Sequence, residues 1–123
     1  MANPNLVNAT SILGKTETLA LTTSNQTLLN NPASSGKLLK VNTIIIANID
    51  GVTTRSVTLR YYSEDDLGGT GTGITHTINV PNDSSLVVLD KNSCIYLEED
   101  RSLGALASAN GDLVAVISYE EIS

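Results

Sequence analysis

The sequence contains no phenylalanine and no tryptophan, and its four tyrosines are its only aromatic residues. A core without large aromatic side chains has to be aliphatic, so we expect it to consist of Ile, Leu, Val and Ala. The same lack leaves no Trp or Phe ring to form a platform on which a sugar stacks. It therefore disfavours a glycosidase acid pair and a host-encoded carbohydrate-binding module.

Residues that carry chemistry are equally scarce, with one cysteine and one histidine in the chain. Cys94 cannot form an intrachain disulfide, and its apolar strand predicts a buried structural thiol. His76 lies in phase with apolar strand residues and has no accompanying nucleophile motif. The glycines of residues 68–73 lack the Lys-Ser/Thr and the helix of a phosphate-binding loop. We therefore expect no enzyme, no catalytic residue and no cofactor.

Positive charge is also scarce, since 7 Lys and Arg oppose 13 Asp and Glu to give a net charge of −6. This balance argues against nucleic acid and anionic membrane as partners and suits a basic protein surface. The acidic runs at 64–66 and 98–100 lack the ligand spacing of a calcium loop, so we expect solvated charge and no metal site. No long apolar run and no secretion signal are visible.

What the sequence does contain is alternation of apolar and polar residues with a period of two. Its strongest stretch is residues 37–62, in which two β-branched arms flank Asp50-Gly51. This pattern predicts a β-hairpin around which the rest of the chain is organised. Asn110-Gly111 predicts a second hairpin near the C-terminal end.

Turn signals every 8 to 12 residues separate about nine expected strands, and no helical periodicity extends beyond one turn. The spacing predicts an all-β fold, a two-sheet antiparallel β-sandwich that is either jelly-roll-like or immunoglobulin-like. The disulfide and the core tryptophan of true immunoglobulin domains are absent. We expect one sandwich domain over residues 16–123, preceded by an extended arm over residues 1–15.

Two stretches are candidate protein-protein interfaces. The arm is either a frayed terminus or a segment that docks on a neighbouring subunit, and it is unusually apolar for a free tail. Within the predicted hairpin, Ile44 and Ile46 fall opposite the main apolar stripe, as do Val114 and Val116 in the last strand. Either a second layer of the same chain or another subunit covers that face. The interface candidates are Asn3, Pro4, Leu6, Val7, Ile12, Leu13, Ile44 and Ile46.

Most of the chain resembles a known group of proteins, through the stretches MANPNLVNATSILGKT, GKLLKVNTIIIANIDG and SLVVLDKNSCIYLEEDRSLGALASANGDLVAVISYEEIS. These stretches resemble small virion proteins of tailed phages that infect marine bacteria, especially cyanophages. The shared elements are the MANPN start, the K-V-N-x-I-I-x-x-N-x-D-G segment, V-V-L-D-K, L-E-E-D-x-S-L and the closing S-Y-E-E. Cys94 departs from the usual pattern.

The resemblance implies a capsid decoration (cement) protein on a β-sandwich. Such a protein would bind the major capsid protein on the outside of the virion at three-fold or quasi-three-fold positions, as a homotrimer. It would be made in the host cytoplasm and would stabilise contacts between capsomeres. The alternative is a tail, neck or fibre-associated module that takes part in host adsorption.

Overall fold

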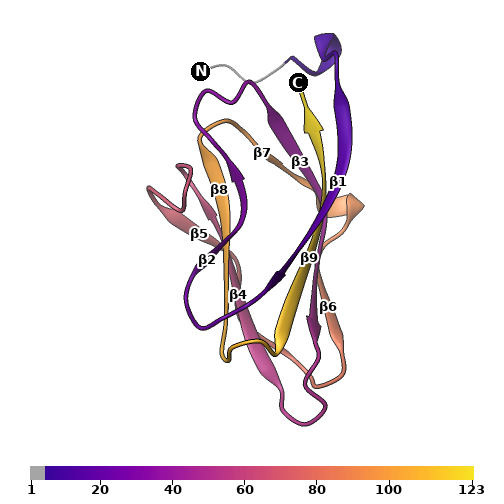
Figure 1. The fold of residues 1–123 in the computed structure, drawn as a ribbon, viewed down its shortest axis with the longest axis vertical. Coiled ribbons are helices and arrows are strands. Elements are labelled where there is room, and N and C mark those ends of the chain that lie inside the picture. Colours follow the sequence, from indigo (N-terminus) through magenta and orange to yellow (C-terminus); the bar gives the residue numbers. More distant parts are fainter. Residues whose placement is uncertain (1–4) are drawn as a thin grey trace.

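The computed structural model describes residues 5–123, and within this range nine strands form two antiparallel sheets (Figure 1). The strands are β1 (Ile12–Ala20), β2 (Gln26–Asn31), β3 (Leu38–Asn48), β4 (Arg55–Tyr62), β5 (Gly71–Val80), β6 (Ser85–Leu89), β7 (Ile95–Leu97), β8 (Arg101–Ala107) and β9 (Leu113–Ile122). Two short 3-10 turns, η1 (Leu6–Asn8) and η2 (Lys91–Ser93), accompany them. The predicted two-sheet antiparallel β-sandwich is confirmed.

The strands pair in a nested order. Sheet A has the order β1-β9-β3-β6, with β7 also pairing with β3, and sheet B has the order β2-β8-β4-β5. Apart from β7, the first strand pairs with the last, the second with the last but one, and so inward to β4 and β5. This is the order of a jelly roll, in which a long two-armed ribbon rolls into two facing sheets. Of the two alternatives left open by the sequence, the structure has the jelly roll.

The predicted hairpin over residues 37–62 is wrong as a pairing, because β3 lies in sheet A and β4 in sheet B. The connection at 49–54 crosses between the sheets, and the connection around Asn110-Gly111 does the same between β8 and β9. Tight hairpins have loops of about two residues, whereas the longer 49–54 connection can span the roughly 10 Å between packed sheets. Local turn signals were correct about where the chain reverses, but not about which strands pair.

A β-bulge in β3 decides which of its side chains enter the core. The pairing with β9 passes from Val41 opposite Tyr119 to Thr43 opposite Ser118, so Asn42 is an extra residue. An extra residue reverses the alternation of faces. Leu39 and Val41 are buried before the bulge, and the residues two positions apart that are buried after it are Ile44 and Ile46.

Ile44 and Ile46 are therefore corrected from interface candidates to core residues. Both are completely buried and belong to the central apolar cluster. A side chain with no accessible surface cannot contact a partner. The second sheet of the same chain covers these two residues.

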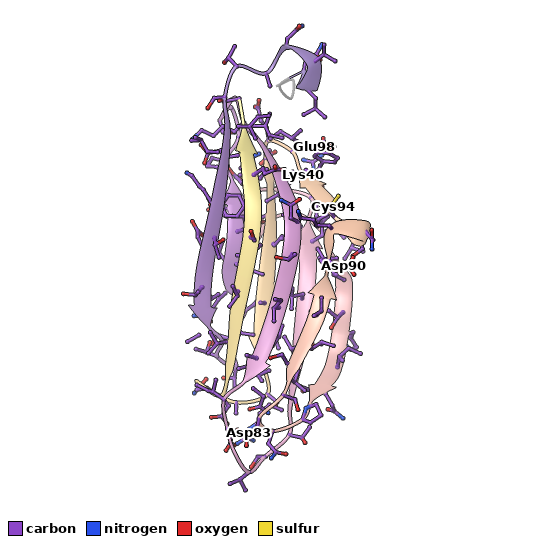
Figure 2. The ribbon with its side chains drawn as sticks, turned by 90° about the vertical axis from the view of Figure 1, so that its right-hand side faces the viewer. Lys40, Asp83, Asp90, Cys94 and Glu98 are labelled. Atoms are coloured by element: carbon purple, nitrogen blue, oxygen red, sulfur yellow. The ribbon has the colours of Figure 1, made fainter. Side chains whose placement is uncertain are left out.

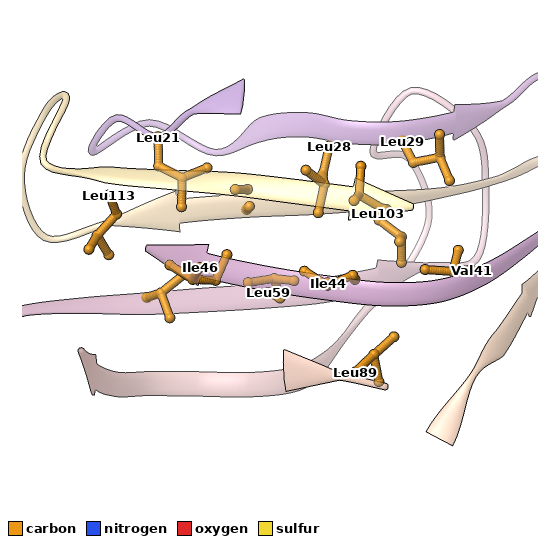
Figure 3. Packing of buried hydrophobic residues seen from close by; sticks show 14 of the residues in the cluster. Leu21, Leu28, Leu29, Val41, Ile44, Ile46, Leu59, Leu89, Leu103 and Leu113 are labelled. Atoms are coloured by element: carbon orange, nitrogen blue, oxygen red, sulfur yellow. The ribbon is translucent and has the colours of Figure 1, made fainter. Parts of the chain in front are cut away.

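The core between the sheets is aliphatic, as the composition predicts (Figure 3). Tyr119 is the one aromatic residue among the buried members of this cluster within residues 5–123. The largest completely buried aliphatic members of the cluster are Leu21, Val41, Ile44, Ile46, Val57, Leu59, Val80, Leu97, Leu103, Leu113 and Ile117. Both sheets contribute to this set, so neither sheet is stable without the other.

The sandwich begins earlier in the chain than the sequence suggests. Residues 12–15 belong to β1 and pair with β9, so they are part of sheet A and not of a free arm. Before β1, Asn5 caps η1 by accepting a hydrogen bond from the Val7 amide at 2.9 Å. Ser11 and Ser123 exchange two backbone hydrogen bonds, which joins the two ends of the chain. The predicted interface residues Asn3 and Pro4 lie outside the described residues.

Candidate protein-binding surface

The outer face of sheet A carries apolar side chains that do not belong to the core. In one row Val116 is opposite Ile45, and Ile45 is opposite Val87; in the next row Val114 is opposite Ala47. Residues directly opposite one another point to the same face of a sheet. We call Ile45, Ala47, Val87, Val114 and Val116 the sheet A patch.

The sheet A patch is accessible from solvent. Val87 is 57% exposed, and the other four side chains are half-buried. None of the five belongs to the central cluster or packs against it. Figure 2 shows the strands of sheet A lying side by side, with no further layer over them. A group of apolar side chains on the open face of a sheet is typical of a surface that meets another protein.

The sequence located only part of this surface. The two-faced last strand was predicted, and Val114 and Val116 do lie on the face away from the core. If Ile44 and Ile46 lay opposite the main apolar stripe, as unbroken alternation predicts, Ile45 would face the core; the bulge at Asn42 turns it to the outer face. The signal for it was the polar pair Asn42-Thr43 inside an otherwise apolar run, at the point where the alternation changes phase.

A second apolar surface lies at the N-terminal end of the described chain. Leu6, Val7, Ile12 and Leu13 are all exposed, and Val7 is 90% exposed. We call these four residues the N-terminal apolar segment. Ile12 pairs with Ile122, whereas Val114 of the sheet A patch pairs with Ala20. The two surfaces therefore lie at opposite ends of the β1–β9 ladder, the long axis of the molecule in Figure 1.

A pocket of about 520 Å³ opens between β1 and β2, and its charged side chains already have hydrogen-bond or ion-pair partners within the chain. The Tyr119 hydroxyl donates to Glu17 at 2.9 Å, and burial together with this hydrogen bond raises the pKa of Tyr119 to about 12. Lys15 and Lys37 bind the two carboxylate oxygens of Glu121 at 2.7 and 2.9 Å. Their hydrogen bonds hold the pKa of the Glu121 carboxyl below its usual value. This arrangement joins strands and does not bring a general acid to a base.

The remaining candidate residues lie apart. His76 is exposed on β5, in a bulged stretch where the Thr77 amide donates to the Thr58 hydroxyl. Cys94 is half-buried directly after η2 and before β7, rather than buried within a strand as predicted (Figure 2). Within residues 5–123, no three His, Cys, Asp or Glu side chains are grouped so as to hold a metal ion. No helix in the same range is long and apolar enough to span a bilayer.

Comparison with known proteins adds little to these observations. No family model matches the chain, and no curated protein matches it. One solved structure with a similar fold comes from Bacillus endospore appendages, described as a family of disulfide-linked pili. It is 14% identical, with 99% of this chain and 92% of that chain covered, and the TM-score is 0.49. A likeness at this level carries no argument about function.

Proposed function

We propose that this chain is a structural protein of a phage virion, a capsid decoration protein that binds the outer capsid surface and stabilises contacts between capsomeres. The resemblance of its motifs to small virion proteins of marine tailed phages supports the proposal. The observation that carries it is the presence of two accessible apolar surfaces, the sheet A patch and the N-terminal apolar segment, at opposite ends of one rigid sandwich.

Two separated surfaces suit a protein that connects neighbouring subunits of a shell. Each surface buries apolar area against the major capsid protein, and the sandwich between them keeps the two contacts at a fixed distance. Such a bridge stabilises the shell because separating the two subunits would expose both contacts to water. The net charge of −6 keeps free copies apart in solution.

The test is binding of purified chain to shells assembled from the major capsid protein, together with thermal melting of the decorated shells. One variant, Ile45→Asp, places a charge in the sheet A patch. A second, Leu6→Ser with Val7→Ser, removes apolar area from the N-terminal segment without touching β1. We expect either variant to lower shell occupancy and to cancel the rise in shell melting temperature.

The matched control is Ile78→Ser, which removes an exposed aliphatic side chain from β5 in sheet B. This control should bind like the parent chain. Equal binding by all variants would contradict the proposal.

Copy number in purified virions provides an independent check. A number that scales with the capsid subunits agrees with decoration, and a small fixed number would favour the alternative of a tail, neck or fibre module.

A further inference from the structure

The four sheet edges are not equally protected against pairing with another chain. Natural proteins protect edges with bulges and with short strands. In sheet B, β2 and β5 are both interrupted by register shifts, and at the far edge of sheet A, β7 is short and the β6 pairing is shifted. By contrast, every residue of β1 from Ile12 to Ala20 pairs with β9 without a shift, and nearly all of β1 is exposed. Within residues 5–123, no strand pairs with its free edge.

The backbone groups that β1 presents at this edge can be identified from its pairing with β9. Ser11 and Ser123 exchange both of their backbone hydrogen bonds, and the Leu21 amide donates to the Leu113 carbonyl. In an antiparallel ladder, the residues that bond to one neighbour alternate with those that face the other side. The odd-numbered residues of β1 therefore bond to β9. Gly14, Thr16 and Thr18 direct their amides and carbonyls to the free edge.

We propose that β1 pairs antiparallel with β1 of a second copy, about a twofold axis at Thr16. In this register Thr16 faces its own symmetry mate, and Gly14 faces Thr18 of the other copy. All of these residues present free backbone groups to one another. The same register places Lys15 opposite Glu17 of the second copy, so one edge carries two complementary ion pairs. Leu13 meets Leu19 in the same way.

Neighbouring registers are less stable because they place like charges opposite each other. Moving the axis by one residue to Lys15 would place Lys15 opposite itself, and moving it to Glu17 would place Glu17 opposite itself. Like charges directly opposite each other destabilise a strand pair. Lys15 and Glu17 can serve the new pairing while keeping their present partners. The lysine ammonium has three protons and uses one on Glu121, and a carboxylate accepts several hydrogen bonds.

The paired molecule has one continuous double-length sheet, with the two sheet A patches on the same face. This twofold dimer replaces the homotrimer that the sequence resemblance implies. It rests on the edge of β1 alone and stands whether or not the chain decorates a capsid.

The register is tested by cysteine cross-linking in a Cys94→Ser background, which removes the one native thiol. In a hydrogen-bonded antiparallel pair, opposite Cα atoms are about 5.5 Å apart, which lies within disulfide range. Thr16→Cys should form an intermolecular disulfide under mild oxidation. Lys15→Cys and Glu17→Cys should not, because in the proposed register neither faces its own copy. Cross-linking at 15 or 17 in preference to 16 would overturn the register.

The pairing itself is tested by the mass of the full chain in sedimentation over a concentration series. We expect a monomer–dimer equilibrium. Thr16→Pro removes the backbone amide directed to the free edge and the exposed 3.4 Å hydrogen bond from the Thr16 hydroxyl to the Ser118 hydroxyl, but no backbone hydrogen bond to β9. It should shift the equilibrium fully to monomer with the far-ultraviolet spectrum unchanged. Lys15→Glu and Glu17→Lys should each weaken the dimer, and the double exchange should restore it. A monomer at all concentrations, a trimer, or a double exchange no better than the single variants would overturn the proposal.

Discussion

At the scale of single residues, Asn48 joins parts of the molecule that are distant in sequence. Its side-chain amide donates to the Thr53 carbonyl at 3.0 Å and to the Val80 carbonyl at 2.9 Å, and its oxygen accepts from the Asp50 amide at 2.9 Å. The side chain is almost fully buried. It therefore holds the crossing connection at 49–54 against the end of β5. These side-chain hydrogen bonds fix the connection, which has no hairpin ladder between β3 and β4 to hold it.

We expect Asn48→Ala to destabilise the fold by roughly 1–3 kcal/mol, because it leaves the buried Val80 carbonyl without its donor. Urea unfolding measures this change. Asn79→Ala is the matched control, since Asn79 is exposed on β5 and should change stability by no more than about 0.5 kcal/mol. Equal stability of the two variants would show that the Asn48 amide contributes nothing.

Glu121 supports a prediction about pH. Its carboxyl has a pKa below the ordinary 4.5, chiefly through the hydrogen bond from Lys15 and then that from Lys37. A lowered pKa in the folded chain means that the stabilisation is complete above the unfolded value and is lost as pH falls through the folded value. We expect Glu121→Gln to cost about 1–2 kcal/mol at pH 7. The difference from the parent chain should shrink on acidification below pH 4.5.

The control for this experiment is Glu120→Gln. Glu120 lies 3.9 Å from Lys40, and its side chain is more exposed than that of Glu121. An exposed pair at this distance contributes little. Denaturant unfolding between pH 7 and pH 3 should therefore separate the two variants at neutral pH and bring them together in acid. A difference for Glu121→Gln that is independent of pH would contradict this explanation.

At the scale of elements, the bulge at Asn42 decides that Ile44 points into the core and that its neighbour Ile45 points to the outer face. Ile44→Asp would bury a carboxylate in the core, so we expect a loss of more than about 4 kcal/mol and an unfolded chain. Ile45→Asp lies on the outer face and should stay within about 1 kcal/mol of the parent. Thermal unfolding followed by circular dichroism distinguishes them. The opposite order of stability would mean that β3 has no bulge.

The strands and turns also show which features of the fold can be predicted from the sequence and which cannot. Period-two alternation located most strands and the aliphatic core, because alternation is a local property of each strand. Asp50-Gly51 and Asn110-Gly111 marked real reversals of the chain but were assigned to hairpins, since the pairing of β3 with β9 is decided by contacts far apart in sequence. Ile44 and Ile46 were placed on the wrong face, since one extra residue reverses all later positions. The N-terminal apolar residues were identified from composition and are exposed.

At the scale of the whole molecule, the nested strand order makes the fold depend on its last strand. β9 lies between β1 and β3, so sheet A cannot assemble before β9 is present. We expect a chain ending at Asp112 to be unfolded by circular dichroism, whereas removal of Ser123 alone should leave the fold intact. The full chain should refold in roughly milliseconds to seconds, since its pairings are mostly long-range. A chain that lacks β9 and still folds would contradict the dependence of the fold on its last strand.

The bond exchange between Ser11 and Ser123 also has a mechanical consequence. Because β1 and β9 are antiparallel neighbours, the chain enters and leaves the sandwich at one pole (Figure 1). Force applied between the two ends would load the hydrogen bonds of this ladder one after another, as in opening a zipper. Force between the N-terminal end and the opposite pole near Asp83 would load many of them at once, in shear (Figure 2). The molecule should be weak along the first direction and strong along the second.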